Sequence, residues 1–167
     1  DSNISDEQIE SQIAILNQDY RRVYDTPAYG AGVDMKIQLC LATKDPDGNE
    51  TKGITRTESG LSEHNSTNDQ ALKNLIRWDT ERYLNIWVVK EISSGGSNTL
   101  GYTYIPGTVP RTRDGVVVTS KYVGTIGTAT APYNQGRTTT HEVGYFLGLH
   151  HTFRSEGQCR DTFISNC

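Results

Sequence analysis

One spacing near the end of this 167-residue sequence constrains the fold more than any other feature. His141 and Glu142 are followed by Gly148, seven positions after the histidine, and by His151, ten positions after it. The residues between them are typical of a helix that ends at Gly148, because glycine lets the chain turn sharply there. Such a turn brings His151 back to the first histidine from outside the helix. The spacing therefore predicts one site shared by two imidazoles and a carboxylate.

This spacing matches four of the five fixed positions in the long zinc signature H-E-x-x-H-x-x-G-x-x-H. In that signature, histidines four residues apart lie on one helical face and hold one zinc ion, and the glutamate takes a proton from the water. We therefore expect Glu142 to be the catalytic base and His141 and His151 to be zinc ligands. His150 adjoins His151 and is expected to point elsewhere, in an exposed or packing role.

Tyr145 stands where the signature has its second histidine. A neutral phenol is a poorer zinc donor than imidazole. Two interpretations stay open: Tyr145 is the third metal ligand, or it is a packing phenol that donates a hydrogen bond. In either case we expect zinc to bind weakly.

Hydrophobic periodicity predicts an α+β, α/β-like fold. Apolar residues recur every three or four positions over residues 6–24 and 69–78, and a last helix is expected over 137–147. Alternation and β-branched residues predict strands over 33–41, 83–92, 100–105 and 115–120. We expect a twisted mixed sheet of about five strands, with a backing helix and the helix of His141.

Composition and charge exclude some classes of protein. The net charge is −4, which argues against nucleic-acid partners, and no apolar run reaches the length of a membrane span. Charged residues are only 22%, with many Thr, Ser, Asn and Gly, which favours an extracellular protein. Three cysteines allow at most one intrachain disulfide. Cys159 and Cys167 can close a short loop, and Cys40 is expected to be a buried thiol in the first strand.

Two further polar segments are interpreted as loops. His64 lies in the polar run SEHNSTND and is expected to be a loop residue. Asp45, Asp47 and Asn49 resemble half of a calcium loop, but no glutamate follows at the distance that an EF-hand needs. A turn is therefore favoured at this position, and calcium is kept as a second candidate cation.

Several stretches, spread over nearly the whole chain from Leu16 onward, resemble the pappalysin family of metzincin metalloendopeptidases: CLATKDPDGN, GITR, LNIWVV, LGYTYIPGT, DGVVV and GRTTTHEVGYFLGLHHTF. The resemblance implies a secreted zinc endopeptidase with an upper, N-terminal subdomain over residues 1–151. Residues 152–167 would begin the lower subdomain. It also implies that one strand edge pairs with extended peptide or protein substrate, through Leu100, Gly101, Tyr102, Thr103 and Tyr104.

Two departures from this family qualify the expected activity. Tyr145 replaces a histidine, and the only methionine is Met35, so no methionine turn follows His151. We therefore expect an upper subdomain whose lower subdomain is missing. Three functions stay open: an impaired zinc endopeptidase, a catalytically dead peptide-binding relative, or an inactive fragment of an active protease. We also expect Phe146 and Leu147 to be exposed on the cleft face, where two copies of the chain would associate.

Overall fold

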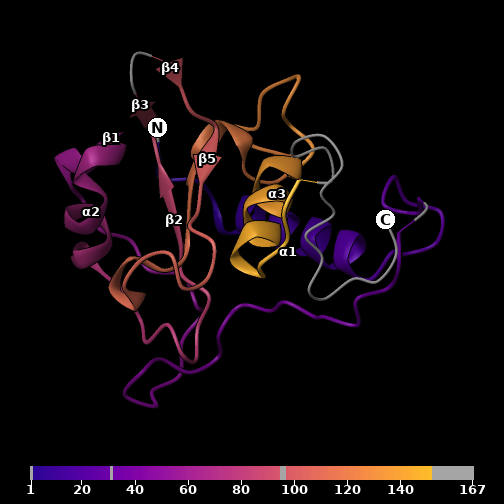
Figure 1. Cartoon of the computed structure of the whole chain (residues 1–167), viewed down its shortest axis with the longest axis horizontal. Helices are drawn as coiled ribbons and strands as arrows, with labels where there is room; N and C mark the ends of the chain where they lie inside the picture. The colour runs from indigo at the N-terminus through magenta and orange to yellow at the C-terminus, as the bar shows by residue number, and fades with distance from the viewer. Residues whose placement is uncertain (1, 31, 95–96, 152–167) are drawn as a thin grey trace.

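The computed structural model describes residues 2–30, 32–94 and 97–151. Within these residues the elements run in the order α1 (Asp6–Tyr20), β1 (Glu63–Asn65), α2 (Asp69–Leu75), β2 (Ile86–Val89), β3 (Glu91–Ser94), β4 (Ser97–Asn98), β5 (Gly101–Tyr102), β6 (Val116–Thr119) and α3 (Arg137–Phe146). The predicted α+β class is confirmed, with α3 near the middle of the molecule and α2 at one end (Figure 1). None of the described helices has the length and apolar character needed to cross a membrane.

The strands form two small sheets in place of the single sheet of about five strands that was expected. Their orders are β1-β3-β4 and β2-β6-β5. The strand predicted over residues 83–92 is divided between them at Lys90, whose backbone N–H donates to the carbonyl of Ser62. In the second sheet β2 runs parallel to β6, and β5 is antiparallel to β6. β5 therefore ends the sheet and pairs on one side only, as far as the described residues show.

Strand β6 separates two parts of the core. Val116 and Val118 pack with Leu16 of α1 and Val143 of α3, and all four are fully buried. Val117 points to the opposite face, as alternation along a strand requires. There it joins a second cluster, completed by Leu72 of α2, Trp87, Val89 and Ile92. Helices α1 and α3 thus cover one face of the β2-β6-β5 sheet, and α2 covers the other.

Helix α1 begins as predicted and ends earlier. The side chain of Ser5 accepts a hydrogen bond from the backbone N–H of Gln8, which is the predicted cap. The helix ends at Tyr20, four residues before the expected end, and Arg22 already has a positive φ of 49°. The buried side of the helix carries glutamines as well as apolar residues, since Gln8 and Gln12 are 1% and 3% exposed.

These two glutamines hold the loop that leads into α3. The amide of Gln8 donates to the carbonyl of Val123 and accepts from the backbone N–H of Thr128. The amide of Gln12 donates to the carbonyl of Gly136, directly before α3, and accepts from the N–H of Gly124. Buried polar groups need such partners, so the loop has a fixed path to the helix.

The strand predicted over residues 33–41 is wrong. The backbone of Leu39 pairs with the side-chain amide of Asn17, at 2.8 Å in both directions, in place of a neighbouring strand. Lys36 has a φ of 56°, which interrupts an extended chain. Ile37 and Leu39 still face the core, as the alternation predicted. Cys40 is exposed, so its predicted burial is also wrong, because this segment is not sandwiched in a sheet.

Candidate active site

Helix α3 carries the motif, and its end has the geometry that the sequence predicts. Gly148 follows the last helical turn with a φ of 86°. The N–H of Gly148 donates to the carbonyl of Tyr145, and the N–H of Leu149 donates to the carbonyl of Gly144. This pair of bonds is the Schellman motif, which needs a left-handed residue at the glycine position. The chain turns there and returns His151 to the helix.

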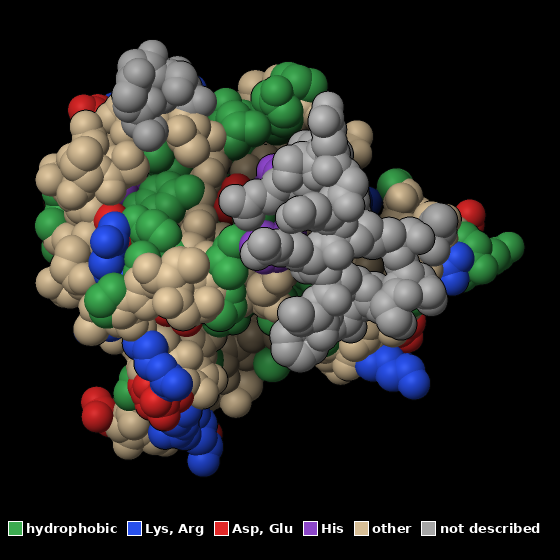
Figure 2. Space-filling model, viewed as in Figure 1, with side chains coloured by type: hydrophobic (Ala, Val, Ile, Leu, Met, Phe, Trp, Pro, Cys, Tyr) green, Lys and Arg blue, Asp and Glu red, His purple; other side chains and the backbone are tan. Residues whose placement is uncertain are grey.

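The side chains of His141, Tyr145 and His151 come together at the end of α3. The Nε2 atoms of the two histidines are 3.2 Å apart, and the phenol oxygen of Tyr145 is 2.7 Å from Nε2 of His151. The ring centroids of His141 lie 4.9 Å from those of both Tyr145 and His151. Figure 2 shows histidine side chains (purple) near the middle of this face, next to an acidic side chain (red).

The two imidazoles fit one zinc ion. Two nitrogen ligands at tetrahedral angles and about 2.05 Å from zinc are about 3.3 Å apart, close to the 3.2 Å found between His141 and His151. No group of three His, Cys, Asp or Glu that could hold a metal occurs among the described residues. Tyr145 occupies the position at which the signature has its second zinc-binding histidine.

Glu142 adjoins His141 and lies almost entirely inside the protein, with 8% of its surface exposed. Burial raises the pKa of its carboxyl to about 7, and a hydrogen bond from the backbone of Thr103 opposes that rise. The strand β5 passes very close to this side chain: a Cβ added to Gly101 would lie 3.2 Å from Cγ of Glu142. A carboxyl with a pKa near 7 is well matched to exchanging a proton near neutral pH.

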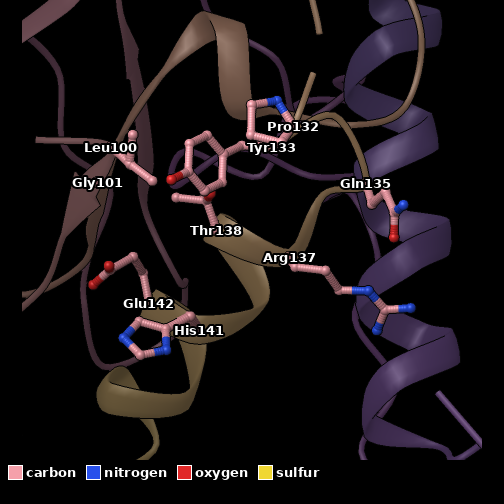
Figure 3. A pocket seen from close by; sticks show the side chains of 9 residues that line it. All are labelled: Leu100, Gly101, Pro132, Tyr133, Gln135, Arg137, Thr138, His141 and Glu142. Atoms are coloured by element: carbon pink, nitrogen blue, oxygen red, sulfur yellow. The ribbon is translucent and has the colours of Figure 1, made fainter. Parts of the chain in front are cut away.

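A cavity of about 510 Å³ opens beside Glu142, between α3, β5 and the loop before α3. In Figure 3 Glu142 and His141 lie side by side on α3, below Leu100 and Gly101. Arg137 points the other way, towards α1, where it pairs with Asp19. The lining residues are Leu100, Gly101, Pro132, Tyr133, Gln135, Arg137, Thr138, His141 and Glu142.

The five residues expected at the substrate edge divide into two groups. Leu100 and Gly101 line the cavity, and Thr103 reaches Glu142 through its backbone. The side chains of Tyr102 and Tyr104 are directed elsewhere, to a cluster around Asp69. Of the strand predicted over 100–105, only residues 101–102 form β5, and the carbonyl of Leu100 also accepts from the N–H of Thr119 in β6.

The sequence patterns do not predict this cluster. His64, expected in a loop, is 1% exposed, lies in β1 and hydrogen-bonds to the hydroxyl of Tyr102. Asp69 and Lys73 are buried as an ion pair one helical turn apart. The signal that could have found them is the i,i+4 spacing of opposite charges on a short helix.

Four other expectations have different outcomes. Phe146 packs against the core, which contradicts its expected exposure, whereas Leu147 is 37% exposed. The predicted turn at Asp45 is confirmed, since its carboxylate accepts from the N–H groups of Asp47 and Asn49. The predicted disulfide of Cys159 and Cys167 and the predicted second subdomain lie outside the described residues.

Comparison with known proteins agrees with this geometry. Residues 65–165 match the peptidase family model described as pregnancy-associated plasma protein-A. An extracellular metalloprotease of Arthroderma benhamiae is 37% identical over 164 residues, which cover 95% of this chain and 50% of the relative. Extracellular metalloprotease 1 of Coccidioides posadasii is 31% identical, over 99% of this chain and 51% of the relative.

A solved structure gives the same result. Mature mirolysin of Tannerella forsythia, in complex with a cleaved peptide, superposes with a TM-score of 0.76 and 44% identity, over 89% of this chain and 58% of that one. The chain thus spans about half the length of the curated relatives that it matches. With the family model covering more than half of its residues, the chain belongs to the pappalysin family of metzincin-type metalloendopeptidases.

Proposed function

We propose that this chain provides the zinc-binding helix and the peptide-docking strand of a secreted endopeptidase, and that Tyr145 weakens its metal binding. The observation that carries the proposal is the approach of His141 to His151, Nε2 to Nε2 at 3.2 Å, beside the buried carboxyl of Glu142. The relatives named above are extracellular metalloproteases, which supports secretion and a metal cofactor.

The residues of the chain divide the work as follows. His141 and His151 would hold zinc, which when bound polarises water for attack on a peptide carbonyl. Glu142 would accept a proton from the attacking water and pass it to the leaving nitrogen. The exposed edge of β5 pairs with an extended peptide by backbone hydrogen bonds. The complex of mirolysin with a cleaved peptide supports this last role.

Weak metal binding follows from the chemistry of Tyr145. Two imidazoles and water bind zinc less tightly than three imidazoles, and the phenol hydrogen-bonds to Nε2 of His151, the atom that would bind the metal. A metal ion that binds at Nε2 of His151 would displace this hydrogen bond. The alternative role for Tyr145 is that of a third metal ligand. Calcium is kept as a second candidate cation.

The same hydrogen bond favours a second candidate function, a peptide-binding relative without catalysis. Loss of zinc would leave β5 and most of the cavity beside Glu142 in place. His141 is the one proposed metal ligand among the residues that line this cavity. Such a chain would bind extended peptides and release them uncut.

A peptidase assay and zinc analysis on the chain test the proposed impairment. We expect no detectable cleavage of casein or of a quenched fluorogenic peptide, with or without added zinc, and substoichiometric zinc by elemental analysis. Cleavage that 1,10-phenanthroline abolishes would show an active enzyme and would contradict the impairment. Tyr145→His, assayed in parallel, separates the loss caused by the metal site from any other loss.

A further inference from the structure

A buried polar cluster lies on the face of the β2-β6-β5 sheet that α2 covers, behind the proposed docking strand. We call it the Asp69 cluster; its members are His64, Asp69, Lys73, Tyr102, Tyr104 and Arg113. They come from β1, α2, β5, the segment after β5 and the short 3-10 helix before β6. Nothing in the proposed chemistry at Glu142 uses these side chains.

Asp69 is the centre of the cluster and is 1% exposed. Its Oδ1 accepts from the hydroxyl of Tyr102 at 2.6 Å and from Nζ of Lys73 at 2.9 Å. Its Oδ2 accepts from Nε of Arg113 at 2.7 Å. Burial by itself would raise the pKa of Asp69, but these three donors outweigh burial and lower the pKa. The group is therefore a carboxylate, held from two sides.

Tyr102 is fixed by two hydrogen bonds to one oxygen. Its single hydroxyl proton goes to Asp69, so Nε2 of His64, at 2.7 Å, must donate to the phenol oxygen. The ammonium of Lys73 lies 5.4 Å from the ring centroid of Tyr102 and 4.9 Å from that of Tyr104, within the range of cation–π attraction. The tyrosine ring thus has one position.

That position matters because β5 is short and lies against the base. Its ladder with β6 contains only Gly101 and Tyr102, extended by one bond from the N–H of Thr119 to the carbonyl of Leu100. So short a ladder is weak alone. Successive residues of a strand face opposite sides, so Tyr102 points into the cluster while Gly101 faces Glu142. We propose that the Asp69 cluster, acting through Tyr102, positions β5 from behind so that its free edge can pair with a peptide in front. This inference rests on the proposed docking function of β5.

Two variants and one matched control test the proposal in the whole chain. Tyr102→Phe removes both hydrogen bonds and keeps the ring. Asp69→Asn weakens the two ion pairs and the hydrogen bond from Tyr102. Tyr83→Phe is the control. It removes a single hydroxyl that donates to the carbonyl of Lys44, and this hydrogen bond involves no residue of β5 or of the Asp69 cluster. The peptide probe is a fluorescein-labelled decapeptide of alternating Ala and Thr, because strand addition depends on backbone groups.

Amide hydrogen exchange gives a readout within one strand. The N–H of Thr119 donates to the carbonyl of Leu100 and reports β5, whereas the N–H of Val116 donates to the carbonyl of Asn85 and reports the β2 side. In Tyr102→Phe we expect Thr119 to exchange about tenfold faster relative to Val116 and the peptide to bind about tenfold more weakly. A role in general stability alone would speed both amides equally.

The outcomes separate the two proposals. If folded Tyr102→Phe keeps the Thr119-to-Val116 exchange ratio and the peptide affinity of the unmodified chain within twofold, the positioning role is wrong. If the unmodified chain binds no peptide, the docking function of β5 fails, and the exchange ratio still decides whether the cluster holds β5. Should Asp69→Asn not fold, Tyr102→Phe alone carries the test.

Discussion

The phenol oxygen of Tyr145 lies 2.7 Å from Nε2 of His151, the nitrogen that faces Nε2 of His141 across 3.2 Å. One substitution in the motif therefore has two effects. It removes an imidazole from the helix, and it places a phenol within hydrogen-bond distance of the ring nitrogens of the remaining distant histidine. On the proposed zinc role both effects would lower metal affinity, and they can be separated by different substitutions.

Tyr145→His should raise zinc affinity by about 100-fold or more, because a third imidazole completes the protein ligands of a tetrahedral site. Tyr145→Phe removes only the competing hydrogen bond and should raise affinity slightly. Competition with a chromophoric chelator measures both, and Tyr24→His, at a position 77% exposed, controls for an added surface histidine. A loss of affinity in Tyr145→Phe would make the phenol a ligand, and tight one-to-one zinc in the unmodified chain would contradict weak binding.

Burial of the Glu142 carboxyl should lower the free energy of unfolding at neutral pH. Its pKa rises from 4.5 to about 7 on folding because the carboxyl is buried. Below pH 4.5 both states are protonated; between 4.5 and 7 the unfolded chain releases its proton first, so stability falls as pH rises. The full loss, present above pH 7, is about 3 kcal/mol at about 1.4 kcal/mol per pKa unit.

Glu142→Gln should therefore unfold at higher urea than the unmodified chain at pH 8 and at a similar urea concentration at pH 4. Unfolding curves in EDTA measure the difference without a metal contribution. Glu10→Gln, an exposed residue of α1, serves as the control and should change neither curve. Equal stability of the unmodified chain and Glu142→Gln at pH 8 would show that the carboxyl is not buried as described.

The sequence was most informative where a local rule decides the structure. The end of α3 follows from Gly148 and the start of α1 from Ser5, and both are confirmed. The prediction of a strand over residues 33–41 was wrong because alternation indicates which side chains face inward. It does not indicate which group pairs with the backbone. Ile37 and Leu39 do face the core, but the backbone partner of Leu39 is the side chain of Asn17.

The site was predictable for a similar reason and only in part. The spacing within eleven residues defines the meeting of His141, Tyr145 and His151, whereas the surroundings of Glu142 depend on residues far along the chain. Gly101 and Thr103 approach Glu142 because β5 is antiparallel to β6. No periodicity reports that register, so neither the raised pKa of Glu142 nor the burial of Asp69 follows from the sequence.

Asp19 should be important for stability because it ties α1 to the first turn of α3. One of its oxygens pairs with Arg137 and the other accepts from the hydroxyl of Thr140 at 2.7 Å. Its side chain is only 8% exposed, whereas that of Arg137 is 37% exposed. Asp19→Ala should therefore lower the free energy of unfolding by about 2 kcal/mol, less than for a fully buried pair.

The control for Asp19 is Asp34→Ala. Asp34 pairs with Arg21 at 3.2 Å, but the two side chains are 40% and 43% exposed, so this substitution should cost less than about 0.5 kcal/mol. Urea unfolding of both variants at pH 7 measures the two values. Equal losses in Asp19→Ala and Asp34→Ala would contradict the structural role of the contact between α1 and α3.

Gly101 should be required for function more than for stability. A Cβ at this position would lie 3.0 Å from the carbonyl of Val117 and 3.2 Å from Cγ of Glu142. Both distances are shorter than ordinary contacts, so β5 or the carboxyl must move by a few tenths of an ångström. A displacement of that size costs little folding energy but changes the geometry on which proton transfer depends.

Gly101→Ala, introduced together with Tyr145→His, should therefore reduce any restored peptidase rate by about tenfold or more, with a change in unfolding free energy of about 1 kcal/mol. Gly60→Ala in the same background is the matched control, since a Cβ at position 60 meets no atom within 4 Å. Initial rates with a quenched peptide, compared with urea unfolding of the same preparations, measure the two effects. If the rate in Gly101→Ala falls only as far as in Gly60→Ala, the close approach of β5 to Glu142 is not what positions the base.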